Sequence, residues 1–242
     1  MLRITVLLIL LPVMLFAQDA ISLLKEADEH YIHRDEQGEI QKAIDGYSKA
    51  LESDAKNYAA AWKLSKSYWY LGNHTEKDKG SVFELGIEAG KKAVAIDDKS
   101  CEGHFWLGVN YALLGENSSM FKALSIVDDV KREMKLSMEI NENCECGGPQ
   151  RVLGKLYEKL PWFKGGSKSK SVEYLQKSLQ LCPRDTQSRI FLAETYLDQG
   201  KEDLAAQQLN LVLSQQPDPA WIPETKENKI KADKMLGRLR KE

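Results

Sequence analysis

Apolar residues recur three and four positions apart along almost the whole chain after Gln18, and alternating β-branched runs are nearly absent. That spacing places apolar side chains on one stripe of an α-helix, so it predicts helix after helix and no sheet. The clearest segment starts at Thr186 and has small and apolar residues at fixed intervals, namely Leu192, Ala193, Tyr196, Gly200, Ala205, Leu209, Val212 and Pro217. We expect two antiparallel helices here, with the proline ending the second.

These intervals match the L-G-x2-Y, A-x3-F and P pattern of the tetratricopeptide repeat, in which small residues let two helices approach closely. First helices with the same pattern are predicted to start near Tyr58, Cys101 and Gly147. Second helices are recognised by their small residues, at Ala43 to Ala50, Gly86 to Ala93 and Ser171 to Ser178. The sequence therefore predicts an all-α, tetratricopeptide-like helical-repeat solenoid of about four to five helix pairs.

The predicted units are longer than the standard repeat. Their starts lie 43, 46 and 39 residues apart, against about 34 residues in the standard unit. We expect the excess in polar loops between the paired helices, at residues 73–80 and 161–169. The repeat domain is predicted over residues 18–222, and a polar capping helix over residues 223–242.

The first residues have the layout of a secretory signal peptide. Arg3 precedes the apolar run Ile4–Leu15, and the small residue Ala17 precedes Gln18. The run is too short to span a bilayer, so we expect cleavage of residues 1–17 near Ala17 and a periplasmic or secreted protein. An uncleaved anchor is the alternative.

Composition narrows the function further. The chain has 34 Lys and Arg against 36 Asp and Glu, a net charge of −2, which argues against nucleic acid as a partner. No nucleophile elbow, phosphate-binding loop or carboxylate pair stands out, and the four histidines lack metal-ligand spacing. We therefore expect a binding protein with no catalytic residue, metal or cofactor.

Two stretches resemble a known family. Residues 153–171 carry Leu-Gly-x-Leu-Tyr, then Pro-Trp-x-x-Gly-Gly-x-Lys, and residues 193–196 read Ala-Glu-Thr-Tyr. They resemble the T component of tetratricopeptide-associated TRAP transporters, and the similarity runs from about residue 20 to the C-terminus. The resemblance implies a periplasmic protein that pairs with a TRAP substrate-binding subunit and helps to transfer a small organic or hydrophobic ligand. The lipid-attachment cysteine expected of that family is absent here. A weaker similarity to eukaryotic microtubule-dynamics regulators is ascribed to the shared repeat.

The first helix of each unit has positions that face the inner groove of such a solenoid. The residues at these positions are Trp62, Lys66, Trp69, Tyr70, Phe105, Val109, Arg151, Lys155 and Ile190. They predict an aromatic floor beside a basic strip, suited to a small organic acid, a hydrophobic ligand or an extended peptide with an acidic end. The alternative is that several of the aromatic residues only fill the core. A general adaptor that binds peptide segments of envelope proteins is the competing function, and a homo-oligomer stays open.

A Pro-Trp-Phe-Lys-Gly-Gly loop interrupts the unit that starts near Gly147. Pro161 ends a helix, and Gly165 and Gly166 permit a positive φ. Trp162 and Phe163 are large apolar residues on a connection. Two interpretations stay open, a loop that contacts a protein partner and a loop whose aromatic side chains fold back onto the neighbouring helices.

The four cysteines fall at turns between units. An exported chain meets an oxidising compartment, where disulfides persist. We expect either Cys144 or Cys146 to pair with Cys182, provided that the repeat register brings their Cα atoms within reach.

Overall fold

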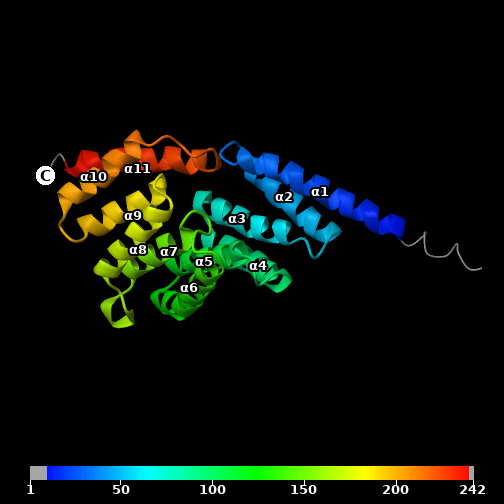
Figure 1. Cartoon of the computed structure of the whole chain (residues 1–242), viewed down its shortest axis with the longest axis horizontal. Coiled ribbons are helices and arrows are strands. Elements are labelled where there is room, and N and C mark those ends of the chain that lie inside the picture. The colour runs from blue at the N-terminus through cyan, green and yellow to red at the C-terminus, as the bar shows by residue number, and fades with distance from the viewer. Residues whose placement is uncertain (1–9, 240–242) are drawn as a thin grey trace, which may run out of the picture. The chain divides into compact units, whose positions relative to one another are not determined.

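The computed structural model describes residues 10–239, with side chains from Ala20 onward. Within that range the chain forms eleven α-helices and two short 3-10 helices, and none of the described residues lies in a strand (Figure 1). The all-α helical-repeat prediction is confirmed. The chain divides into two compact units, residues 1–119 and residues 120–242, which we describe separately.

Unit 1 contains five consecutive helices. They are α1 (Leu10–Ile32), α2 (Glu39–Ser53), α3 (Tyr58–His74), α4 (Lys79–Ile96) and α5 (Cys101–Glu116). Each helix packs against the next one in the chain, and α3 also contacts α1 and α5. The helices α1, α3 and α5 are the first members of successive pairs, and together they form one face of unit 1, the α1–α3–α5 face.

Small residues bring the helices of unit 1 to backbone distance. A Cβ atom on Gly46 would lie 2.8 Å from Cβ of Ala27, and one on Gly90 would lie 2.9 Å from Cα of Leu107. Asp28 adds polar ties between α1, α2 and α3, because it accepts hydrogen bonds from the Tyr47 hydroxyl at 2.7 Å and from Nζ of Lys63. The small positions of the repeat therefore allow the close approach that the sequence predicted.

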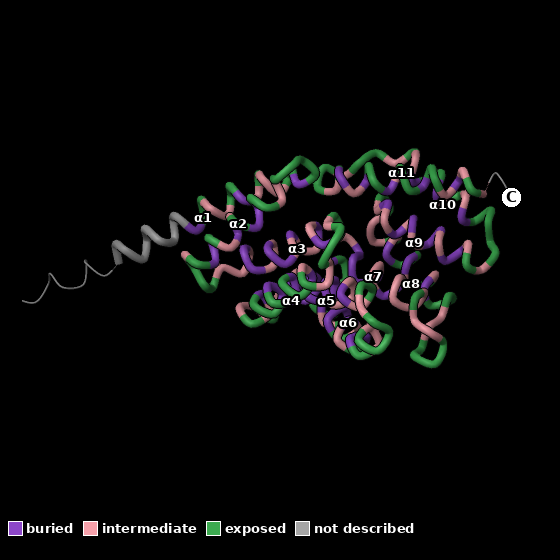
Figure 2. The backbone as a smooth tube through the Cα atoms, turned by 180° about the vertical axis from the view of Figure 1, so that it is seen from behind, coloured by how far each residue is buried: buried purple, intermediate pink, exposed green. Residues whose placement is uncertain are grey.

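Unit 2 contains six α-helices and the two 3-10 turns. They are α6 (Met120–Ile140), α7 (Gly148–Lys159), η1 (Trp162–Lys164), α8 (Lys168–Leu181), α9 (Thr186–Leu197), α10 (Glu202–Ser214), η2 (Pro219–Trp221) and α11 (Ile222–Leu239). Consecutive α-helices again pack together, and α9 contacts α7, α8, α10 and α11. Buried and exposed residues alternate along these helices, and the turn at residues 162–165 is exposed (Figure 2). Its core is built around Leu175, Ile190, Ala193 and Leu209, each 0% exposed.

The observed helix starts agree with the repeat register. The helices α3, α5 and α9 begin at Tyr58, Cys101 and Thr186, and α7 begins at Gly148, one residue after the expected start. A side-chain cap explains two of these positions. Asn57 accepts a hydrogen bond from the Ala60 amide at 3.0 Å, and Asp185 accepts from the amides of Gln187 and Ser188.

The expected location of the extra residues is only partly right. Asn73 and His74, predicted to begin a loop, form the end of α3, where Nδ2 of Asn73 donates to the Trp69 carbonyl at 2.8 Å. The extra length lies mainly in the helices, since α3, α4 and α6 have 17, 18 and 21 residues. Both predicted loops form in shorter versions, at residues 75–78 between α3 and α4 and at residues 160–167 between α7 and α8.

The sequence also predicted a feature at each end of the chain. The helix α11 (Ile222–Leu239) occupies the segment predicted to cap the repeats and packs on α9 and α10. Residues 1–9 of the predicted signal peptide lie outside the described residues, as do all side chains before Ala20, so cleavage near Ala17 stays a prediction. No helix in the described range combines the length and the apolar character that crossing a bilayer requires.

Candidate binding site

The α1–α3–α5 face carries a group of aromatic rings around two cations. Its members, which we call the cation–aromatic cluster, are Tyr31, Arg34, Trp62, Lys66, Trp69, Tyr70 and Trp106. Nζ of Lys66 lies 5.3 Å from the ring centroid of Tyr31 on α1 and 5.2 Å from that of Trp106 on α5. It also lies 5.9 Å from the ring of Trp62 on its own helix. All three distances are within the range of cation–π attraction.

The second cation, Arg34, is 4% exposed and packs under the cluster. Its Cζ atom lies 4.7 Å from the Tyr31 ring centroid and 5.5 Å from that of Tyr70, and it donates a hydrogen bond to the Tyr31 carbonyl. Trp69 meets Trp106 at 5.2 Å between ring centroids. Rings from three helices thus hold one another in place around Lys66.

The predicted groove residues of unit 1 separate into two groups. Trp62, Lys66 and Trp69 are half-buried members of the cluster. Tyr70, Phe105 and Val109 are 3%, 1% and 7% exposed, so the structure places them in the packed interior instead of on an open surface. Phe105 and Val109 are buried because both α3 and α4 cover α5.

Three residues of the cluster were not foreseen from the sequence. Trp106, next to Phe105, is the α5 residue that meets Lys66 and Trp69. Tyr31 and Arg34 come from the end of α1 and the turn after it, a stretch in which the sequence located no repeat start. Their spacing of three residues, one helical turn, was the available signal.

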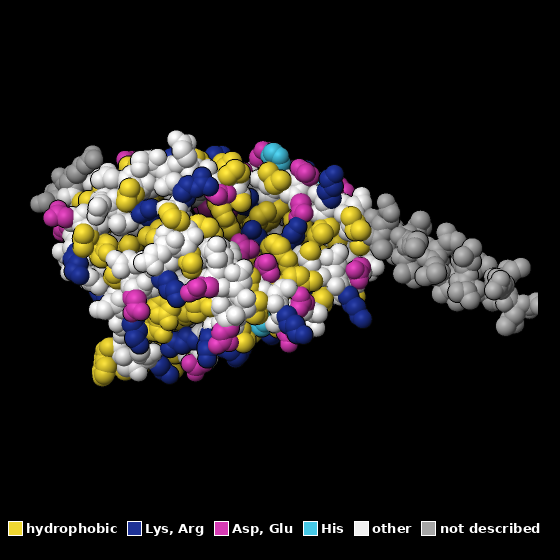
Figure 3. Space-filling model, viewed as in Figure 1, with side chains coloured by type: hydrophobic (Ala, Val, Ile, Leu, Met, Phe, Trp, Pro, Cys, Tyr) yellow, Lys and Arg dark blue, Asp and Glu magenta, His cyan; other side chains and the backbone are white. Residues whose placement is uncertain are grey.

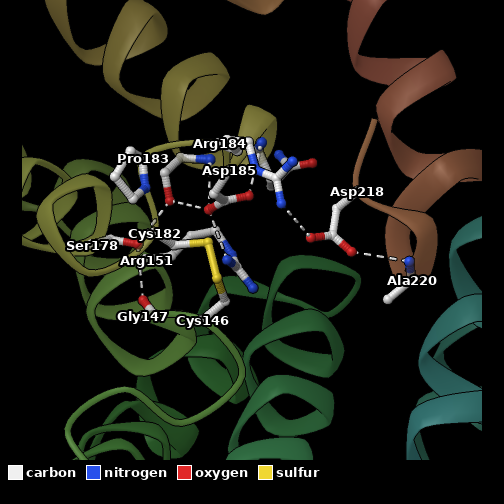
Figure 4. Close-up of a disulfide and its surroundings, with 12 residues drawn as sticks. Cys146, Gly147, Arg151, Ser178, Cys182, Pro183, Arg184, Asp185, Asp218 and Ala220 are labelled. Atoms are coloured by element: carbon white, nitrogen blue, oxygen red, sulfur yellow. Dashed lines mark hydrogen bonds and ion pairs between the residues drawn. A yellow bond between two sulfur atoms is a disulfide. The ribbon is translucent and has the colours of Figure 1, made fainter. Parts of the chain in front are cut away.

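Unit 2 contains the residues predicted to form a basic strip, and both cations have carboxylate partners. Nη1 of Arg151 lies 2.7 Å from Oδ2 of Asp185 (Figure 4). Nζ of Lys155 lies 2.6 Å from Glu158 and 2.8 Å from Glu194. Both predicted cations are thus paired with carboxylates of α7, α9 and the residue that caps α9, and a ligand carboxylate would compete with these partners.

Glu194 is shared between two lysines. Its second oxygen lies 2.7 Å from Nζ of Lys231 on α11. Burial favours the neutral form of both Lys155 and Glu194, but the opposite charges outweigh it. The neighbouring carboxylates raise the pKa of Lys155 above its usual value, and the two lysines lower the pKa of Glu194. Ile190, the last predicted groove residue, is 0% exposed and belongs to the core.

The predicted aromatic and basic residues fall in different units, residues 1–119 and 120–242, and each set is described within its own unit. The aromatic set forms the cluster around Lys66, in which Trp62 and Trp69 are half-buried. The basic set forms internal ion pairs that connect α7, α9 and α11.

The Pro161–Gly166 loop is exposed. Trp162 is 85% and Phe163 is 60% exposed, which contradicts the interpretation that both rings fold back onto neighbouring helices. The loop projects from the end of α7 in Figure 1, and hydrophobic side chains stand out at the same place in Figure 3. A role in contacting a protein partner stays a prediction.

A disulfide joins Cys146 to Cys182, with 5.3 Å between their Cα atoms (Figure 4). It is one of the two pairings that the sequence left open, and no cysteine of the chain is free. Near it, Oγ of Ser178 donates to the Gly147 carbonyl at 2.9 Å, which also ties α8 to the start of α7. The described residues contain no group of His, Cys, Asp and Glu that could hold a metal ion.

Comparison with known proteins gives one family and several similar folds. The family model "Regulator of microtubule dynamics protein 1-3" matches residues 23–145. Superkiller complex protein 3 of Mus musculus is 23% identical over 190 residues, which cover 71% of this chain and 12% of that protein. For the Homo sapiens protein the identity is 23%, with 64% of this chain and 11% of the relative covered. The chain thus spans only a small part of the curated relatives it matches.

Two solved structures show the same fold. TTC0263, a thermophilic TPR protein of Thermus thermophilus, has a TM-score of 0.71 and 20% identity, covering 90% of this chain and 98% of that one. PilF of Pseudomonas aeruginosa has a TM-score of 0.60 and 17% identity, covering 93% of each chain. The sequence favoured the transporter component over the microtubule-regulator group, whereas the family match is to the latter.

Proposed function

Since this chain belongs to the family described as Regulator of microtubule dynamics protein 1-3, we propose that it is a non-catalytic helical-repeat adaptor. Its ligand in this proposal is an extended peptide segment of a partner protein, held on the α1–α3–α5 face. The general adaptor comes before the transporter component because the relatives and the similar folds are tetratricopeptide proteins of several kinds.

The observation that carries the proposal is the position of Lys66 between rings of α1, α3 and α5. Half-buried rings offer apolar contact to a peptide without a large loss of conformational entropy, since each ring is already fixed by its neighbours. The ammonium group adds a positive charge beside the rings, which favours a partner segment that carries acidic side chains. A segment with alternating apolar and acidic side chains matches both features.

The test is peptide selection from a displayed library, followed by affinity measurement of the selected peptides by fluorescence anisotropy. The double variant Lys66→Ala/Trp69→Ala should weaken binding by roughly tenfold or more, because it removes one charged and one aromatic contact. The matched control Leu85→Ala/Lys92→Ala removes one apolar and one charged side chain from exposed positions on α4 of the same unit. Equal affinities of the two double variants would place the peptide elsewhere.

The proposal places the protein outside the cytoplasm. The leader-like residues 1–17 support it, and so does the absence of any free cysteine, since disulfides persist in oxidising compartments. Mass spectrometry of the protein from the periplasmic or secreted fraction should give a chain that begins at Gln18. A full-length mass in the cytoplasmic fraction would count against export.

A narrower form of the proposal is a TRAP-associated component that docks a substrate-binding subunit and handles a small organic or hydrophobic ligand. It rests on the resemblance of residues 153–196. Co-purification with a TRAP substrate-binding subunit is the direct test, and light scattering of the purified chain tests whether it forms a homo-oligomer. A monomer that ignores that subunit but binds peptides supports the general adaptor alone.

A further inference from the structure

The loop between α7 and α8 is rigidly built. The amides of Lys164 and Gly166 both donate to the Pro161 carbonyl, at 2.9 and 3.1 Å, and the Ser167 amide donates to the Tyr157 carbonyl at 2.9 Å. Gly165 has a φ of 87°, and a Cβ atom on Gly166 would lie 1.8 Å from the Leu160 carbonyl oxygen. Two glycines and a closed set of backbone hydrogen bonds therefore fix one loop conformation.

That conformation presents two aromatic side chains to the outside. Trp162 is 85% exposed and Phe163 is 60% exposed, and their ring centroids lie 6.0 Å apart in an edge-on arrangement. Behind them, Tyr157 and Tyr174 stack at 5.4 Å and support the base of the loop. A stable monomer does not need so much apolar area on a projecting turn, so this area is available to a partner.

The side chains around the aromatic tip are basic. Residues 159–170 contain four lysines and no Asp or Glu. Lys164 stands directly at the tip and is exposed, while Nζ of Lys170 lies 5.3 Å from the Tyr157 ring centroid. Lys168 lies 3.4 Å from the exposed carboxylate of Asp198, and Lys159 lies 3.3 Å from Glu158, whose side chain is only 5% exposed. Two of the four lysines therefore face a carboxylate, and Lys164 and Lys170 give the surface beside the two rings its positive charge.

We propose that this loop binds the surface of an anionic lipid bilayer, with Trp162 and Phe163 inserted at the level of the headgroups and the lysines against the lipid phosphates. Tryptophan favours the membrane–water interface, where one part of its ring system is apolar and the other wet. Each lysine near an anionic surface adds attraction that decays within a Debye length. The proposal is independent of peptide binding on the α1–α3–α5 face, because the loop belongs to unit 2.

An anionic membrane fits these features better than a protein pocket does. The two rings lie edge to face on a narrow turn and are surrounded by flexible lysine side chains, which can follow a fluid layer of phosphates. A preformed loop also loses little conformational entropy on insertion. A protein partner with an acidic rim is the competing occupant, and the experiment below distinguishes the two.

The test uses the full chain after signal cleavage and co-sedimentation with vesicles of phosphatidylcholine that contain about 30% phosphatidylglycerol. The protein should bind these vesicles and should bind pure phosphatidylcholine roughly tenfold more weakly. The double variant Trp162→Ser/Phe163→Ser should lose binding to both kinds of vesicle. The double variant Lys164→Gln/Lys170→Gln should lose only the preference for the anionic lipid.

Two controls keep the experiment decisive. Phe121→Ser removes another exposed ring, 89% accessible, and should leave vesicle binding unchanged. Gly166→Ala should weaken vesicle binding because its Cβ atom displaces the loop, whereas Gly237→Ala has nothing within 4 Å and should not. Circular dichroism should show the same helix content in all variants with exposed substitutions.

Failure of the wild-type chain to bind anionic vesicles overturns the proposal. Vesicle binding that survives Trp162→Ser/Phe163→Ser overturns it as well. A photocrosslinker at position 163 that labels a protein, with no labelling of lipid in the same vesicles, assigns the loop to a protein partner instead.

Discussion

Lys66 and Lys155 hold the same repeat position, nine residues into the first helix of their units as predicted from the sequence, yet their surroundings differ. Lys66 lies among the rings of Tyr31, Trp62 and Trp106. Lys155 lies between the carboxylates of Glu158 and Glu194. Each lysine has one of these partners on its own helix and the rest on neighbouring helices. A repeat position therefore fixes where a side chain points, and the adjacent helices decide what it can bind.

The different partners of the two lysines suit different functions. In unit 2 the ions satisfy one another, which stabilises the helix stack and leaves little charge for a ligand. In unit 1 the cation lies among rings of which those of Tyr31 and Trp62 are half-buried, which leaves part of their apolar area for contact with a partner. The proposed division of labour is binding by the α1–α3–α5 face and internal cross-linking of α7, α8, α9 and α11.

The largest effect is expected from removing the disulfide of unit 2. The variant Cys146→Gly/Cys182→Ser removes a disulfide that spans 36 residues and should cost about 3–4 kcal/mol of unfolding free energy. Glycine is chosen because Cys146 has a φ of 58°. Hydrogen exchange followed by mass spectrometry should show faster exchange in α8 and α9. Unchanged protection there would mean that the disulfide adds nothing to unit 2.

The next largest effect is expected from replacing Lys155, with Lys66 as the comparison. Lys155→Met leaves Glu158 and Glu194 as partly buried anions and should destabilise unit 2 by about 2 kcal/mol. Lys66→Met keeps the volume and removes the charge that lies among the rings, so we expect a smaller loss of about 1 kcal/mol. Urea denaturation measures both, and the exposed Lys92→Met is the control. If Lys66→Met lowered the free energy of unfolding more than Lys155→Met did, the ring contacts and not the ion pairs would be the stronger interaction.

The smallest expected effect is the pH dependence that Glu194 contributes to the stability of unit 2. The lysines lower the pKa of Glu194, so its contribution is fully present above its ordinary pKa of 4.5 and disappears as the pH falls through the lower value of the folded state. The free energy of unfolding from urea titrations should therefore fall below pH 4.5 in the parent chain. The variant Glu194→Gln should show a shallower fall. Identical pH profiles would show that the ion pairs add no stability.

The fold was largely predictable because it depends on local periodicity. Apolar stripes and small residues gave the starts of α3, α5 and α9 to the residue. The helix ends were harder to predict. Asn73 and His74 look like loop residues, yet their side chains hydrogen-bond to backbone carbonyls one turn earlier and continue α3. Composition alone does not show that such a polar residue lengthens a helix.

The site was less predictable because it depends on contacts between helices. Phe105 was predicted to lie in the groove, whereas the neighbouring Trp106 lies in the cluster. Adjacent residues on a helix point about 100° apart, so an error of one residue selects a different face. Arg151 and Lys155 were predicted to form a basic strip because their carboxylate partners, Asp185 and Glu194, are 34 and 39 residues away along the chain. The exposure of Trp162 and Phe163 was one of two open alternatives, since a turn can direct aromatic side chains inward or outward.

The unequal helix lengths limit how this scaffold can be re-engineered. A helix rises about 1.5 Å per residue, so α3 and α4, with 17 and 18 residues, extend farther than α9 and α10, with 12 and 13. An idealised consensus repeat grafted in place of α9 and α10 would meet α8, which has 14 residues, at a similar height. The same graft in place of α3 and α4 would fall about one turn short and expose the ends of its neighbours. Chimaeras of this protein should therefore be joined within unit 2, with the long helices of unit 1 kept together as a block.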